Sequence, residues 1–191
     1  MIWNDVNLIN KFKGKGVVVM PTDTIYGVVG SALQESVVSR IYNIRKRAPE
    51  KPCIILISDV EELQKFSIEL STQQKKKIKE YWSFNNTENF RPTSIILDCN
   101  EDKFTYLHRG TNTLAFRVPA EEDLRKMLTE TGPLIAPSAN PEGLNPSRNI
   151  DEAKNYFGNF VDLYINGGEI TSLPSRVIKL HNDGTVNILR T

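Results

Sequence analysis

The chain has 191 residues, of which 39% are hydrophobic and 25% are charged, a composition typical of a single globular domain with a sizeable core. Its 24 basic and 23 acidic residues leave a formal net charge of +1, which excludes recruitment of nucleic acid or membrane by a strong overall charge, so any bound anion must be held by local groups. The longest apolar runs are only as long as strands, so we expect no membrane partner and a cytoplasmic protein.

The first half of the chain predicts a strand, a helix and a second strand, with a short helix before them. Apolar spacing predicts that this short helix begins near Asn4 or Asp5. A strand over residues 17–20 should stop at Pro21, because proline donates no hydrogen bond to a sheet. Helical spacing follows over residues 35–46, and an apolar run over residues 53–57 predicts a strand that is buried on both faces.

The second half of the chain predicts capped helices between further strands. Ser58 and Ser71 each begin a capping-box pattern, which predicts a short helix and then a lysine-rich one. An amphipathic helix is expected over residues 120–131, and Asn149 is expected to cap another. The further strands are predicted over residues 93–98, 114–118, 134–136, 161–165, 176–180 and 186–189. No repeat or change of composition divides the chain, so we expect one domain over residues 1–191.

Three places in the chain repeat one arrangement, in which a proline is followed at once by hydroxyl or amide side chains. They are Pro21-Thr22-Asp23-Thr24, Pro137-Ser138-Ala139-Asn140 and, less clearly, Pro174-Ser175-Arg176. Open α/β sheets bind ligands at the carboxyl ends of their strands. Basic residues accompany these turns at Arg45-Lys46-Arg47, Lys51 and Arg117, and both arginine forks and hydroxyl groups suit phosphate and carboxylate. The sequence therefore predicts a pocket for two anionic ligands.

Together these segments resemble the YrdC/TsaC-type threonylcarbamoyl-AMP synthases. The matching blocks are Pro21 through Gly27, Arg45-Lys46-Arg47 with Lys51-Pro52, Leu114 through Val118, Ala136 through Asn140 with Gly143 and Pro146-Ser147, Asn166-Gly167-Gly168, and Ile188-Leu189-Arg190. They stand in the family's order and span nearly the whole chain. The resemblance implies a single α/β domain, built on a twisted mixed parallel and antiparallel sheet with helices packed on it and a ligand cleft at the strand ends.

The resemblance also implies a reaction. L-Threonine, bicarbonate and ATP would give L-threonylcarbamoyladenylate and pyrophosphate, and the adenylate would serve the transferase machinery that makes threonylcarbamoyladenosine in tRNA. Attack of a carbamate on the α-phosphorus brings two anions together, so the site must neutralise charge more strongly in the transition state than in the ground state. Mg²⁺ is expected on the phosphates, and no His, Asp or Glu cluster in the sequence predicts a metal held by the protein.

Carried over position by position, the resemblance implies three overlapping groups of site residues. The residues expected to be catalytic are Arg45, Arg47, Ser138 and Asn140. Those expected to bind ATP and its phosphates are Arg47, Lys51, Thr113, Ser138, Ser147 and Arg190. Those expected to bind threonine are Thr24, Arg117, Ala136 and Ser175.

Several positions depart from the family's pattern. Arg45 stands where lysine is usual and Asp23 where glutamate is commoner, and a Trp-Pro-Gly-Pro block is reduced to Asn89-Phe90-Arg91-Pro92. These changes leave open a YciO-like paralogue, either an RNA-binding module or an enzyme that adenylates another acceptor. Simpler interpretations also stay open, with the basic triplet as a solvated helix end and Ser138 and Asn140 as residues that only satisfy a turn.

Two further groups of residues have no expected role in the reaction. Lys75, Lys76, Lys77 and Lys79 are expected to form an exposed helix face, with direct contact to RNA phosphate as the alternative. Cys53 and Cys99 have neither metal-ligand spacing nor a dense disulfide pattern, so we expect both to be reduced. The sequence leaves the oligomeric state open.

Overall fold

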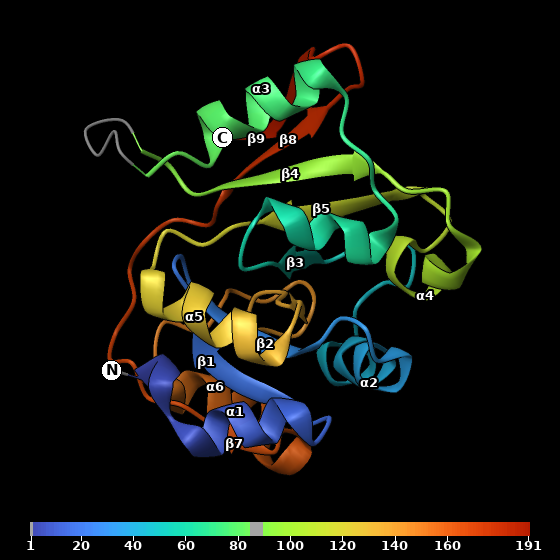
Figure 1. The fold of residues 1–191 in the computed structure, drawn as a ribbon. Coiled ribbons are helices and arrows are strands. Elements are labelled where there is room, and N and C mark those ends of the chain that lie inside the picture. The colour runs from blue at the N-terminus through green and yellow to red at the C-terminus, as the bar shows by residue number, and fades with distance from the viewer. Residues whose placement is uncertain (1, 85–89) are drawn as a thin grey trace.

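The computed structural model describes residues 2–84 and 90–191, and a nine-stranded sheet runs through this part of the chain (Figure 1). The strands are β1 (Val18–Pro21), β2 (Tyr26–Ser31), β3 (Ile54–Leu56), β4 (Thr93–Asp98), β5 (Thr113–Arg117), β6 (Leu134–Ile135), β7 (Leu163–Tyr164), β8 (Arg176–Leu180) and β9 (Val186–Arg190). Their order in the sheet is β7-β1-β2-β6-β3-β5-β4-β8-β9. The pairs β1–β7, β3–β5 and β4–β8 are parallel and the other neighbouring pairs antiparallel, which confirms the predicted mixed sheet.

The helices are short and connect the strands. The α-helices are α1 (Val6–Lys13), α2 (Glu35–Arg45), α3 (Thr72–Tyr81), α4 (Thr105–His108), α5 (Glu122–Thr131) and α6 (Ile150–Phe157), and the 3-10 helices are η1 (Ile2–Asn4), η2 (Val60–Phe66), η3 (Asp102–Phe104) and η4 (Gly158–Phe160). Within residues 2–84 and 90–191, no helix has both the length and the apolar character that crossing a membrane requires. In the segment Asn89-Phe90-Arg91-Pro92, which replaces the family's Trp-Pro-Gly-Pro block, Asn89 lies outside the described residues.

Most of the predicted helix starts are confirmed by side-chain caps. The side chains of Asp5, Ser71 and Asn149 accept backbone N–H groups at the starts of α1, α3 and α6, and Ser71 forms a complete capping box with Gln74. The prediction at Ser58 is wrong, because Asp59 caps η2 and the Ser58 hydroxyl donates to the Asp59 carboxylate instead.

The sheet is buried on both faces near β1, as alternation along that strand shows. Val17 and Val19 pack into one apolar cluster together with Ile41 of α2 and Phe157 of α6. Val18 and Met20 point the other way, into a second cluster that contains residues of α1 and α5. Because side chains alternate across a strand, helices on both sides of the sheet bury this continuous apolar run (Figure 1).

The predicted strand–helix–strand unit is wrong in its connections, because Tyr26–Ser31 form a strand, β2, that the apolar pattern does not predict. This strand forms an antiparallel hairpin with β1, and β2 and β6 then separate β1 from β3 in the sheet. Glycines weaken the strand signal of β2, yet packing requires one of them. A Cβ atom on Gly30 would lie 2.4 Å from Val37 Cγ1, so its absence lets α2 pack directly on β2.

The other half of the sheet has different coverage on its two faces. Ile55, Ile95 and Phe116 point into the cluster that also contains Phe66 of η2 and Ile78 of α3. Residues next to them in sequence point to the opposite face, where they border a cavity. This face of β3, β5, β4 and β8 positions the candidate site.

Candidate active site

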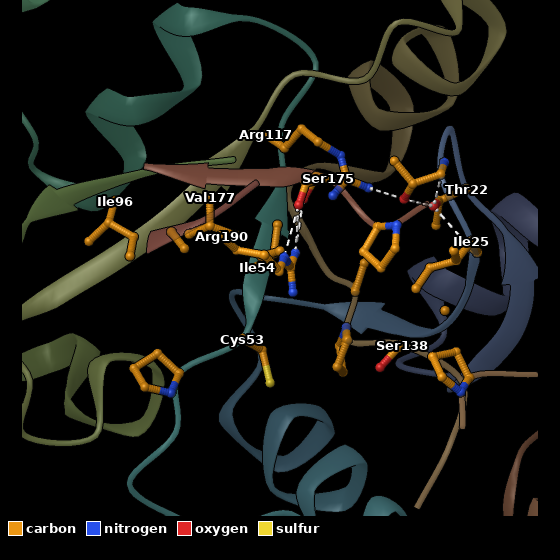
Figure 2. Close-up of a pocket in the computed structure, with 18 of the residues that line it drawn as sticks. Thr22, Ile25, Cys53, Ile54, Ile96, Arg117, Ser138, Ser175, Val177 and Arg190 are labelled. Atoms are coloured by element: carbon orange, nitrogen blue, oxygen red, sulfur yellow. Dashed lines mark hydrogen bonds between the residues drawn. The ribbon is translucent and has the colours of Figure 1, made fainter. Parts of the chain in front are cut away.

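A cavity of about 480 Å³ lies over the sheet and at the ends of several strands (Figure 2). This volume is within the usual range for sites that bind small ligands. Its floor consists of Ile54, Ala115 and Ile96, which are register partners on β3, β5 and β4, with Val177 of β8 beside them. The sequence predicts a cleft at the strand ends only, because period-two patterning does not show which buried strand face lacks a covering helix.

The cavity brings together most of the site residues that the sequence predicts. Those that line it are Thr24, Arg47, Thr113, Arg117, Ala136, Ser138, Ser175 and Arg190. They come from segments far apart in the chain, and Figure 2 shows Arg117, Ser175, Arg190 and Ser138 around one hollow. Arg45, Lys51, Asn140 and Ser147 are not among its lining residues.

The turn after β1 is closed by its own hydroxyl groups. The Thr22 N–H and hydroxyl both donate to the carbonyl oxygen of Ile25, at 3.1 and 2.8 Å, and Thr24 N–H donates to Thr22 Oγ1 at 3.2 Å. Side chains of this type commonly stabilise tight turns by such local bonds. The turn fixes Thr24 at the cavity wall and directs the Asp23 carboxylate into the interior.

Arg117, at the end of β5, forms a buried ion pair with Asp23. Arg117 Nη2 and Nε donate to the same oxygen, Asp23 Oδ1, at 2.8 and 3.2 Å, and only 4% of the Arg117 side chain and 1% of the Asp23 side chain are exposed. Nη2 also donates to Thr24 Oγ1 at 3.3 Å. Asp23 therefore compensates the buried charge of Arg117 and fixes its orientation at the cavity. Asp23 and Arg117 are 94 residues apart, and no sequence pattern predicts that they pair.

A second arginine, Arg190 of β9, reaches the cavity from the far edge of the sheet. Its Nε and Nη2 donate to the backbone oxygen of Ser175, at 3.0 and 2.8 Å, and Nη2 donates to Ser175 Oγ at 3.3 Å (Figure 2). Burial and the nearby charges of Arg117 and Arg91 lower the pKa of Arg190 below its usual value. No acidic side chain of the described residues forms an ion pair with it, so an anion in the cavity would relieve this repulsion.

Arg45 lies behind Ser138 and is 2% exposed. Its Nε donates to the backbone oxygen of Asn140 at 3.0 Å, and its Nη2 donates to Ser138 Oγ at 3.2 Å and to Asn140 Oδ1 at 3.3 Å. Burial lowers the pKa of the Arg45 guanidinium to about 10. Gly27 of β2 and Ser138 form an isolated antiparallel β-bridge. Ser138, which lines the cavity, is therefore held from two sides, by β2 and by Arg45.

Arg47 and Lys51 occupy different places although both follow α2. Arg47 lines the cavity and donates to the backbone oxygens of Lys51 and Pro52, each at 3.0 Å. The Lys51 side chain is largely exposed and pairs with Glu142. Hydrogen bonds from Lys51 and from the Ala48 N–H hold the pKa of the Glu142 carboxyl below its usual value. Glu142 thus fastens this loop beside the cavity, a contact that sequence spacing does not reveal.

Ser147, also predicted to bind nucleotide, donates its hydroxyl proton within the protein and does not line the cavity. Its hydroxyl donates to the backbone oxygen of Ala139 at 2.7 Å, and only 2% of the residue is exposed. The neighbouring Pro146 lines the cavity. Thr22, Tyr26 and Thr111 also line it. Thr22 and Tyr26 belong to the block over Pro21 through Gly27, whereas no pattern in the sequence indicates Thr111.

This arrangement of residues can be compared with known proteins. A family model named Sua5/YciO/YrdC, with the description "Telomere recombination", matches residues 10–191. The chain belongs to the Sua5/YciO/YrdC family. The resemblance predicted from its sequence blocks is therefore confirmed.

Curated relatives within the Sua5/YciO/YrdC family differ in length from this chain. A threonylcarbamoyl-AMP synthase of Pyrococcus abyssi is 30% identical over 155 residues, which make up 80% of this chain and 43% of that protein. A threonylcarbamoyl-AMP synthase of Idiomarina loihiensis is 28% identical over 174 residues, 88% of this chain and 89% of that protein. The chain thus spans less than half of the first relative and most of the second.

Solved structures of the Sua5/YciO/YrdC family have the same fold. P. abyssi Sua5 complexed with L-threonine gives a TM-score of 0.82 at 27% identity, over 96% of this chain and 52% of that one. E. coli YciO gives a TM-score of 0.78 at 24% identity, over 96% of this chain and 86% of that one, a likeness that shows the fold alone. The predicted fold class is therefore confirmed, whereas the roles of individual site residues stay predictions.

Proposed function

We propose that this protein is a threonylcarbamoyl-AMP synthase, which makes L-threonylcarbamoyladenylate and pyrophosphate from L-threonine, bicarbonate and ATP. The observation that carries the proposal is the gathering of Arg47, Arg117 and Arg190 with hydroxyl side chains around one cavity. Such a site suits two anionic ligands held side by side. The names of the relatives, and the L-threonine bound to P. abyssi Sua5, support the same activity.

The proposed chemistry requires positioning and charge neutralisation more than covalent catalysis. The threonine amine adds to bicarbonate with loss of water, and a carbamate oxygen then attacks the α-phosphorus as the bond to pyrophosphate breaks. Arg117 and Thr24 would bind the threonine carboxylate, while Arg47, Thr113 and Arg190 would bind the phosphates. Fixed guanidinium and hydroxyl donors stabilise the charge that develops in such a transition state.

Mg²⁺ would enter this site with the nucleotide. Within residues 2–84 and 90–191, no three His, Cys, Asp or Glu side chains gather where they could hold a metal ion. Mg²⁺ binds readily through phosphate oxygens and water and needs few protein ligands. We infer that the phosphates and water would supply its ligands, and that the cation adds charge neutralisation at the phosphates.

We also infer a place for the product in tRNA modification. An acyl adenylate is a reactive donor, so a transferase that consumes it would follow this reaction, and tRNA is the acceptor that we infer from the names of the relatives. A cytoplasmic location would suit that use.

The decisive experiment is incubation of the purified protein with ATP, Mg²⁺, labelled bicarbonate and L-threonine. We expect labelled threonylcarbamoyladenylate and an equal amount of pyrophosphate. Omission of threonine or bicarbonate should abolish both products. Pyrophosphate release that is faster with another amino acid would identify an enzyme for a different acceptor, and RNA binding without any turnover would identify a binding module.

A further inference from the structure

Ser94 lies in β4, is fully buried, and is not among the residues that line the cavity. Its hydroxyl nevertheless joins two residues that do line it. Arg117 Nη1 donates to Ser94 Oγ at 3.5 Å, and Ser94 Oγ lies 2.9 Å from Ser175 Oγ. A chain of polar contacts therefore runs from Asp23 through Arg117, Ser94 and Ser175 to Arg190.

The number of hydroxyl protons determines which group donates in each hydrogen bond of this series of contacts. A serine hydroxyl has one proton to donate and accepts up to two hydrogen bonds, whereas a guanidinium only donates. If Ser175 donated to Ser94, the proton of Ser94 would need an acceptor, and within the described residues Ser94 Oγ has no third partner. An unpaired donor in the interior is costly, so the favoured arrangement is the one in which Ser94 donates to Ser175.

This arrangement leaves the proton of Ser175 free. Ser175 Oγ accepts from Ser94 at 2.9 Å and from Arg190 Nη2 at 3.3 Å, so both of its acceptor positions are occupied. Ser175 lines the cavity (Figure 2), and its hydroxyl is therefore directed to donate to a ligand there. Its matching partner is a ligand acceptor, since a ligand group that donates would meet no free acceptor on this hydroxyl. The guanidinium groups of Arg190 and Arg117 in the same cavity favour an anionic oxygen as that acceptor.

We propose that Ser94 is a positioning residue, which fixes the Ser175 hydroxyl as a donor to an anionic oxygen of the bound ligand. The inference rests on the proposed function for its ligands, because that oxygen belongs either to a phosphate of ATP or to the carboxylate of threonine. Ser94→Ala removes one of the two donors to Ser175 Oγ and leaves only Arg190, so the Ser175 hydroxyl can turn away from the ligand. One neutral hydrogen bond of this kind corresponds to roughly a three- to tenfold change in affinity.

A double-mutant cycle tests the proposal, with dissociation constants measured by calorimetry for Mg-ATP and for L-threonine separately. We expect Ser94→Ala to weaken one of the two ligands by about three- to tenfold, and Ser175→Ala to weaken the same ligand at least as much. In a Ser175→Ala background, Ser94→Ala should then have no further effect. The affected ligand identifies the source of the anionic oxygen.

Two further variants separate positioning from a general loss of structure. Ser94→Thr keeps the hydroxyl and should restore the wild-type affinity. Ser58→Ala removes another buried serine hydroxyl, which donates to Asp59 outside the cavity lining, and should leave both affinities unchanged. Unchanged affinities for both ligands in Ser94→Ala, or an equal loss with and without the Ser175 hydroxyl, would overturn the positioning role.

Turnover by the wild-type protein keeps this inference distinct from the proposed function. Product formation together with an additive cycle overturns only the role of Ser94. Ligand binding with a non-additive cycle but no threonylcarbamoyladenylate overturns the proposed function and supports the positioning role. Wild-type protein that binds neither Mg-ATP nor L-threonine overturns both.

Discussion

Arg45 and Arg47 are two residues apart in the sequence but lie in different environments. α2 ends at Arg45, and Lys46 then takes a left-handed conformation with φ of 51°, which redirects the chain. Arg45 consequently points into the interior behind Ser138, whereas Arg47 lines the cavity. The basic triplet was open to interpretation as a solvated helix end, and the burial of Arg45 contradicts that alternative.

This difference predicts that the two alanine variants lose unequal amounts of unfolding free energy. Arg45→Ala should lower the free energy of unfolding by about 2–4 kcal/mol, because it leaves a void and removes donors from the Ser138 and Asn140 oxygens. Arg47→Ala should lower it by less than about 1 kcal/mol while abolishing most product formation. Urea denaturation and the labelled-bicarbonate assay measure the two effects. Equal losses of stability would contradict the assignment.

The buried pair of Asp23 and Arg117 gives a second prediction. Asp23→Asn removes the only carboxylate that pairs with Arg117 in the described part of the chain, so the variant should lose about 3 kcal/mol of unfolding free energy. The double variant Asp23→Asn/Arg117→Met removes the buried charge as well and should be more stable than Asp23→Asn alone. Urea denaturation of the three proteins checks this order. A double variant less stable than the single one would show that charge compensation is not the cause.

Individual site residues differed in how far the sequence could predict them. Family blocks correctly indicated that Thr24, Arg117, Ser138 and Arg190 would share one cavity. They could not show that Lys51 pairs with Glu142 outside it, because both residue types are also common in ligand sites. Ser94 gives no signal at all, since a serine within an apolar strand has no motif of its own and its proposed role depends on Arg117 of β5 and on Ser175, just before β8.

At the scale of elements, α2 is tied to the segment before β7 by Arg40 and Asp162. Arg40 donates to both Asp162 oxygens, at 2.6 and 3.0 Å, and Asp162 also accepts the Val17 N–H at 2.7 Å. These hydrogen bonds, chiefly those from Arg40, lower the pKa of the Asp162 carboxyl below its usual value of 3.8. A carboxyl whose folded pKa is lowered adds stability above the unfolded value and loses it as the pH falls through the folded value.

We therefore expect Asp162→Asn to lower the unfolding free energy at pH 7 by about 1 kcal/mol, a modest value because both side chains are partly exposed. The difference from wild type should shrink as the pH falls below 3.8. Urea denaturation between pH 7 and pH 3 measures it. Glu130→Gln, an exposed carboxylate of α5, is the control and should change stability by less than about 0.5 kcal/mol. A pH-independent difference for Asp162→Asn would contradict the linkage.

Capped helices were the elements best predicted, because their signals are local. Asn149 and Ser71 determine helix starts through bonds to residues two to three positions away. The hairpin of β1 and β2 was missed for the opposite reason. Its strand β2 contains Gly27, which allows close approach of Pro137, and Gly30, which allows close approach of α2. No local sequence pattern predicts such contacts.

At the scale of the whole molecule, the cavity is assembled from both halves of the chain. Its lining includes Thr24 from the first hairpin, Arg47 after α2, Ser138 after β6 and Arg190 of β9. A ligand that contacts all of these segments binds only the folded chain, so its binding free energy adds to the stability of the fold as a unit.

This coupling predicts that ligands raise the thermal midpoint of the protein. Mg-ATP at about 100 times its dissociation constant should add about 2.7 kcal/mol, which for a chain of this size corresponds to a rise of roughly 5–10 °C. L-Threonine should give its own rise at a similar excess. Differential scanning calorimetry measures both, and Arg47→Ala, with near wild-type stability, is the matched control for the nucleotide. Because Arg47 lines the cavity, this variant should lose most of the rise with Mg-ATP and keep the one with L-threonine. A full nucleotide-induced rise in Arg47→Ala would place the phosphates elsewhere.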